Sequence, residues 1–146
     1  MARRTVLTSR QRSALFALPQ REAALLRHYT LSDEDLQNIG ARRHPRNKLG
    51  FALQLCVLRY PGRLLSPGEF VPPAVVDFIG RQLDLDGDEL ADYAVRSETR
   101  HEHLAELRRL YGFRSFAGAA AHELGDRLRE LPDCRRLAIL AVCAVE

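Results

Sequence analysis

The residue types that could do chemistry gather first at the beginning of one apolar segment, ARRHPRNKLGFALQLCVLRYPGR, residues 41–63. Arginine and lysine bind phosphate oxygens, and arginine and asparagine can also pair with the edges of guanine and adenine. The candidate DNA contacts here are Arg42, Arg43, His44, Arg46, Asn47 and Lys48. This pattern favours binding of double-stranded DNA, and the alternative is a solvated basic turn without a ligand.

A second group of candidate contacts lies in residues 96–103 and is more mixed in charge. Its members are Arg96, Thr99, Arg100, His101 and His103. Acidic side chains at 98, 102 and 106 reduce the positive charge, so the alternative is an ordinary solvated helix. The apolar stripe of this helix predicts that His103 points away from the core. His101 and His103 would diverge by about 200° on a helix, so they cannot share a metal ion.

The chain lacks the sequence patterns of common catalytic and metal sites. It contains no G-x-S-x-G, no P-loop and no H-E-x-x-H. Cys56, Cys134 and Cys143 have no zinc-type spacing and lie among apolar residues, as buried thiols do in a reducing compartment. The acidic run 33–35 occupies the first turn of a predicted helix, where the helix dipole alone accounts for it. We therefore expect no enzyme, no cofactor and no metal site in this chain.

Basic residues concentrate in the first part of the chain. Residues 1–63 contain 12 Lys and Arg against 4 Asp and Glu, whereas residues 64–146 contain 10 against 15. Such asymmetry is expected when one part of a chain faces a polyanion. No apolar run approaches the roughly 18 residues that span a bilayer, and the start lacks the apolar region of a signal peptide. We therefore expect a cytoplasmic protein with no membrane partner.

Helix signals recur along the chain and predict an all-α fold of about eight helices. Thr8 with Gln11, and Ser32 with Asp35, have the spacing of a capping box. A long helix is expected over 45–60, ended by a Pro-Gly pair. Further helix starts are expected near Gln20, Ser66, Pro72, Asp88, Thr99, Phe116 and Asp133.

The predicted helices 32–41 and 45–60 are separated by a connection of helix-turn-helix length. In such an arrangement the second helix offers its N-terminus, the positive end of its dipole, to the DNA. The apolar residues 49–58 would then make the body of the same helix part of the core. We predict that 1–63 and 64–146 each contain one helix-turn-helix-like unit and that the two units share a helical bundle.

Four stretches of the chain carry a resemblance to a known family. They are LTSRQRSALFALP (7–19), LLRHYTLSDEDL (25–36), RRHPRNKLGFALQLCVLRYPGR (42–63) and TRHEHLAELRRLYGF (99–113). In this order they resemble the N-terminal region of transposases of the Tn3 family, which serve replicative, cointegrate-forming bacterial transposons. The resemblance implies tandem helix-turn-helix units of the centromere-protein-B kind that recognise terminal inverted repeats. It also implies that the catalytic acidic triad belongs to a distant C-terminal domain.

The resemblance places the family's first basic motif on Arg42, Arg43, Asn47 and Lys48, and its second on Thr99, Arg100, His101 and His103. We expect a module that binds double-stranded transposon ends during DNA transposition and recombination in the bacterial nucleoid. Arg46 and Asn47 would face base edges, and oligomers would form through the rest of the transposase. The alternative is a helical protein–protein module that helps to assemble the transposition complex, which the apolar segment 134–146 favours.

Overall fold

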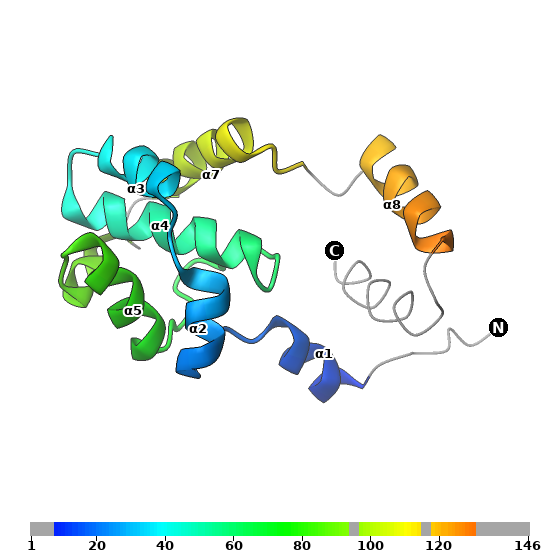
Figure 1. Ribbon diagram of the computed structural model, residues 1–146, viewed down its shortest axis with the longest axis horizontal. Helices are drawn as coiled ribbons and strands as arrows, with labels where there is room; N and C mark the ends of the chain where they lie inside the picture. The colour runs from blue at the N-terminus through cyan, green and yellow to red at the C-terminus, as the bar shows by residue number, and fades with distance from the viewer. Residues whose placement is uncertain (1–7, 94–96, 115–117, 131–146) are drawn as a thin grey trace. The chain divides into compact units, whose positions relative to one another are not determined.

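A computed structural model of the chain describes residues 8–93, 97–114 and 118–130. These residues form helices and no strand, which confirms the all-α class expected from the sequence. In chain order the elements are α1 (Ser9–Phe16), α2 (Glu22–Tyr29), α3 (Asp33–Gly40), α4 (Pro45–Arg59), α5 (Pro73–Leu83), a 3-10 turn (Gly87–Glu89), α6 (Leu90–Tyr93), α7 (Ser97–Tyr111) and α8 (Ala119–Arg129) (Figure 1).

The chain divides into two compact units. One unit spans residues 18–110 and contains α2 to α6 together with α7 up to Leu110, whereas α1 and α8 belong to the other. The division expected after residue 63 falls inside the 18–110 unit, where α4 packs against both α5 and α6. All candidate contacts that the structure describes lie in this one unit.

Two helices begin with the capping boxes that the sequence predicts. In α1 the Gln11 N–H donates to Thr8 Oγ1 at 3.2 Å, and Gln11 Oε1 accepts from the Thr8 N–H at 2.9 Å. In α3 the Asp35 N–H donates to Ser32 Oγ at 3.2 Å, and Asp35 Oδ2 accepts from the Ser32 N–H at 2.9 Å. Each box satisfies backbone donors that have no partner inside the helix.

Helix α4 is the core element of the 18–110 unit. Every residue from Leu49 to Val57 is buried, because α2, α3, α5 and α6 pack around it. Figure 1 shows α4 among α2, α3 and α5. A helix that is apolar nearly all round must be buried in this way, as the sequence predicts. Gly50 permits the closest approach, since a Cβ at that position would overlap the ring of Tyr93 from α6.

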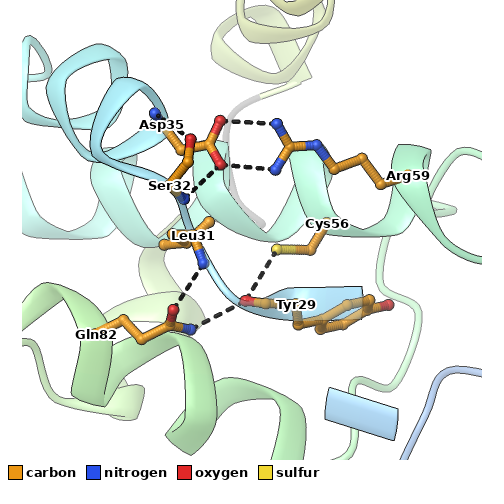
Figure 2. Close-up of polar contacts among 7 residues, drawn as sticks. All are labelled: Tyr29, Leu31, Ser32, Asp35, Cys56, Arg59 and Gln82. Atoms are coloured by element: carbon orange, nitrogen blue, oxygen red, sulfur yellow. Dashed lines mark hydrogen bonds and ion pairs between the residues drawn. The ribbon is translucent and has the colours of Figure 1, made fainter. Parts of the chain in front are cut away.

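Polar contacts fix α3 and α5 to the rest of the unit (Figure 2). Arg59, the last residue of α4, donates from Nη1 and Nη2 to the two oxygens of Asp35 at 2.7 Å each. Gln82 of α5 accepts from the Leu31 N–H at 2.8 Å and donates to the Tyr29 carbonyl at 3.0 Å. Asp35 is therefore an ion-pair partner as well as a cap, which the helix dipole alone did not predict.

The helix expected after Ser66 is absent from the described residues. Glu69 does accept a hydrogen bond from the Ser66 N–H at 2.9 Å, as a cap would, but the segment forms a turn. The reason is that Gly68 has φ of 71°, a left-handed conformation through which a right-handed helix cannot continue.

Other sequence expectations fall at helix ends or outside the described residues. Helix α7 begins at Ser97, so Thr99 lies inside its first turn and is not the cap. Cys56 is buried, as expected, whereas Cys134, Cys143 and the predicted helix after Asp133 lie outside the described residues. Of the helices that are described, none is long and apolar enough to cross a membrane.

Candidate nucleic-acid interface

The turn between α3 and α4 has the predicted helix-turn-helix length. Helix α3 ends at Gly40, and the Arg42 N–H still donates to the Ile39 carbonyl at 3.1 Å. The backbone becomes extended at His44, which precedes the first residue of α4, Pro45. Proline suits this position because its fixed φ is helical and it has no N–H to leave unbonded.

The N-terminus of α4 differs from that of α3 in charge and in capping. No side chain caps α4, and its first turn holds no acidic residue. In contrast, Ser32 caps α3, whose first turn contains Asp33, Glu34 and Asp35. The Asn47 and Lys48 N–H groups donate to the His44 carbonyl at 3.0 Å each, so it is mainly the positive end of the helix dipole that attracts phosphate here. Of these two helix starts, only that of α4 is suited to an anion.

Basic side chains surround this open helix end. Arg43 and His44 are exposed, and Arg46, Asn47 and Lys48 are partly exposed. Within the described part of the chain, no carboxylate forms an ion pair with Arg43, Arg46 or Lys48. Because Leu49 to Val57 are buried, the first turn is the accessible part of α4 at this end of the helix. A DNA groove could therefore receive this turn but not the length of the helix.

Arg42 has a different environment from the other basic residues of this turn. Its Nη1 lies 2.6 Å from Glu106 Oε2 of α7, and its side chain is only 16% exposed. The guanidinium carbon lies 4.3 Å from the centre of the Phe51 ring. The bond to Arg42 is the main reason that the pKa of Glu106 is lowered. Arg42 therefore joins the α3–α4 turn to α4 and α7.

His103 is part of the core, so its predicted place on an exposed face of α7 is wrong. It is 5% exposed, and its Nδ1 lies 2.9 Å from the Tyr93 hydroxyl. Gln54 Nε2 donates to that hydroxyl at 2.8 Å, so the three side chains form one buried chain of hydrogen bonds. Burial, with a smaller effect of Arg42, lowers the pKa of His103 to about 4. The ring is thus kept neutral as part of the buried core.

The other described residues of the second motif have two kinds of environment, a contact with a loop or a position at the surface. Arg100 donates from Nη2 to the Leu65 carbonyl at 2.7 Å, which ties α7 to the loop after α4. Thr99 is partly exposed and His101 is exposed. Arg96 lies outside the described residues. Arg100 and His101 also line a mostly apolar cavity of about 230 Å³.

Two features of catalytic sites can be examined in the described residues, a metal-ligating cluster and a reactive thiol. Three or more metal-ligating side chains nowhere come together within the described ranges. The thiol of Cys56 is buried, and burial raises its pKa to about 12, so it is a poor nucleophile. The features that stand out are thus the exposed basic turn and the open end of α4.

Sequence reasoning missed one basic residue near this turn. Arg109 of α7 is 72% exposed, and its Nη2 lies 3.7 Å from Glu106 Oε1. Since Arg42 binds the other oxygen of the same carboxylate, Arg109 lies close to the α3–α4 turn. The only local signal was the pair of arginines in the last turn of the helix, at 108 and 109.

These features define a helical unit in which the start of α4 is basic and uncapped, and the comparisons with known proteins give its family. Residues 6–132 match the family described as "Domain of unknown function (DUF4158)", and the chain belongs to this family.

The chain is also similar to the N-terminal region of Tn3-family transposases, which confirms the resemblance seen in the sequence. The transposase for transposon Tn21 of Escherichia coli is 40% identical over 131 residues, covering 90% of this chain and 13% of that protein. The transposase for transposon Tn501 of Pseudomonas aeruginosa is 43% identical over 108 residues, 74% of this chain and 11% of that protein. The chain thus corresponds to a segment of these much longer relatives.

Proposed function

We propose that this chain is the part of a DNA transposase that binds double-stranded DNA at the terminal inverted repeats of a transposon. The observation that carries the proposal is the open N-terminus of α4, which has exposed cations around it and a wholly buried body behind it. The similarity to transposases over 90% of the chain supports the same role. Strand cutting and joining would belong to the rest of such a protein, which would act in the bacterial cytoplasm.

The geometry of α4 suggests how the contact would be divided. Arg43 and His44, ahead of the helix, would bind phosphates, which position a protein without reading sequence. Arg46 and Asn47, in the first turn, would face the edges of guanine and adenine in the major groove. Each good bidentate contact of this kind discriminates against a wrong base by about 1–3 kcal/mol. Lys48 would add a further phosphate contact.

The second motif would contribute less than the first. Arg100 and His103 serve the interior of the unit, since one binds the Leu65 carbonyl and the other is buried. Thr99 and His101 are the described members that reach the surface. We therefore propose the α3–α4 turn as the main DNA contact, with Thr99 and His101 as secondary contacts.

Binding to labelled duplexes tests the proposal directly. Fluorescence anisotropy would compare the terminal inverted repeats of Tn21 and Tn501 with scrambled duplexes of equal length. If about four phosphates are neutralised, the log–log dependence of affinity on salt should have a slope of about −3.6. Binding to one repeat at least tenfold tighter than to its scrambled form is expected. Equal binding to all duplexes would mean that the basic turn binds phosphates without recognising sequence. No binding would refute the proposal.

A matched pair of double variants locates the contact. Arg46→Ala with Lys48→Ala should weaken binding at least tenfold, because both side chains flank the open helix end. Arg27→Ala with Arg81→Ala removes the same charge from exposed positions on α2 and α5 and should change affinity less than threefold. Equal losses from the two double variants would show that net charge alone drives binding.

An apolar surface supports the alternative role in protein–protein contact. Phe70 is 77% exposed and Leu64 is 50% exposed, and Leu64 also lines the 230 Å³ cavity beside Arg63 and Arg100. Isolated apolar side chains on a surface are common, but an exposed leucine that lines an apolar cavity suits a docking site. Sedimentation velocity of the chain and of a Leu64→Ser, Phe70→Ser variant would test this role. Concentration-dependent association that the variant lacks, together with no DNA binding, would favour it.

A further inference from the structure

Two arginines bind the two oxygens of one carboxylate in very different surroundings. Arg42 Nη1 lies 2.6 Å from Glu106 Oε2, and Arg109 Nη2 lies 3.7 Å from Glu106 Oε1. The Arg42 side chain is 16% exposed, whereas that of Arg109 is 72% exposed. The same acidic group therefore holds one cation that is mostly covered and one that is mostly exposed.

The environment of Arg42 argues against a direct contact with DNA. Its guanidinium carbon stands 4.3 Å from the centre of the Phe51 ring, and its Nε is buried without a hydrogen-bond partner in the described residues. Moving this group to a phosphate would break a close ion pair and the stacking on Phe51. A planar guanidinium held in both ways is suited to a structural role, and lysine would not replace it well.

Arg109, in contrast, is exposed and only weakly held by its ion pair. An exposed ion pair at 3.7 Å is weak and is screened by salt, so its arginine can exchange the carboxylate for a phosphate. On a helix, Arg109 lies about 60° around the axis from Glu106, whereas Arg108 lies about 160° away. Arg109 is thus on the side of α7 that faces Arg42, and Arg108 is not.

We infer that the two arginines that bind Glu106 have different roles. Arg109 is a phosphate contact of the DNA interface, and Arg42 is a positioning residue. Through Glu106, Arg42 holds α7 and its exposed Arg109 beside the basic turn formed by Arg43 and His44. The phosphate-binding surface therefore continues from the α3–α4 turn onto α7. This inference rests on the proposed DNA binding.

The salt dependence of binding by the full chain tests the role of Arg109. Arg109→Gln should lower the magnitude of the log–log slope by about 0.9, the value for one lost phosphate contact. Its loss of affinity relative to the unaltered chain should then shrink about threefold when salt is raised about fourfold. Arg108→Gln is the matched control, from the neighbouring exposed position, and should leave the slope unchanged. Equal changes in both variants would overturn the inference.

A double-variant cycle tests the role of Arg42. Arg42→Met should weaken binding, and Arg109→Gln should then have a smaller effect in the Arg42→Met background, because Arg109 is no longer held in place. Additive effects, with the slope falling by about a further 0.9 when Arg109→Gln is added to Arg42→Met, would instead make Arg42 a phosphate ligand. Circular dichroism confirms that Arg42→Met is folded, and Glu106→Gln provides a second way to release Arg109. An unaltered chain that binds no duplex would overturn the proposed function and this inference together.

Discussion

Replacing Arg59 by Met should destabilise the 18–110 unit through the carboxylate that it leaves behind. Asp35 is 1% exposed, and both of its oxygens accept hydrogen bonds of 2.7 Å from Arg59. Met fills a similar volume to the arginine stem but supplies no donor. The buried carboxylate would then lose its charged partner while its hydrogen bond from the Ser32 N–H, at 2.9 Å, remains.

The size of the expected loss in unfolding free energy follows from how deeply Arg59 and Asp35 are buried. Leaving a fully buried charge without its partner costs about 3–5 kcal/mol. The Arg59 side chain is 33% exposed, so water can reach part of the vacated site, and the Ser32 hydrogen bond offsets some of the loss. We therefore expect the free energy of unfolding to fall by about 2–3 kcal/mol. With a urea m-value of about 2 kcal/mol/M, the unfolding midpoint falls by about 1–1.5 M.

Urea unfolding followed by circular dichroism measures this change. Arg27→Met, at an exposed position on α2, is the control and should change stability by less than about 0.5 kcal/mol. Adding Asp35→Asn to Arg59→Met removes the stranded charge and keeps an acceptor for the Ser32 N–H, so it should recover at least half of the loss. An Arg59→Met effect as small as that of the control would refute the reasoning, because it would mean that Asp35 is well solvated.

Three further outcomes are expected from the core of the unit. Gly50→Ala should lower stability by about 1–3 kcal/mol in the same urea assay, because the added Cβ meets the Tyr93 ring, although helix propensity alone predicts a gain. The folded pKa of His103, about 4, lies below its usual value near 6.5, so the unfolded chain binds the proton first. Stability should therefore fall as pH drops from about 6.5 toward 4, by up to about 3 kcal/mol, and His103→Gln should remove this dependence. Cys56, whose pKa is raised to about 12, should resist alkylation at pH 8 until the protein unfolds, as mass spectrometry of a variant lacking the other two cysteines would show.

Several elements of the fold were predictable because their signals are local. The capping boxes at Thr8 and Ser32 join groups three residues apart, so the spacing of residue types is enough to find them. The apolar body of α4 predicts burial for the same reason, since a helix with no polar face must be covered. The Ser66 cap shows the limit of such signals, because a left-handed Gly68 prevents the helix that the cap predicts.

The sequence by itself determined most of the described helices, the buried body of α4 and the concentration of basic residues at its start. Only the tertiary structure decided which charges remain at the surface, because their partners are distant in sequence. Glu106 from α7 binds Arg42, and Arg59 at the end of α4 binds Asp35 at the start of α3. A count of charges treats every arginine alike. Packing distinguishes the arginines that can bind DNA from those that cannot, since a guanidinium held against a carboxylate and a ring is no longer available to a phosphate.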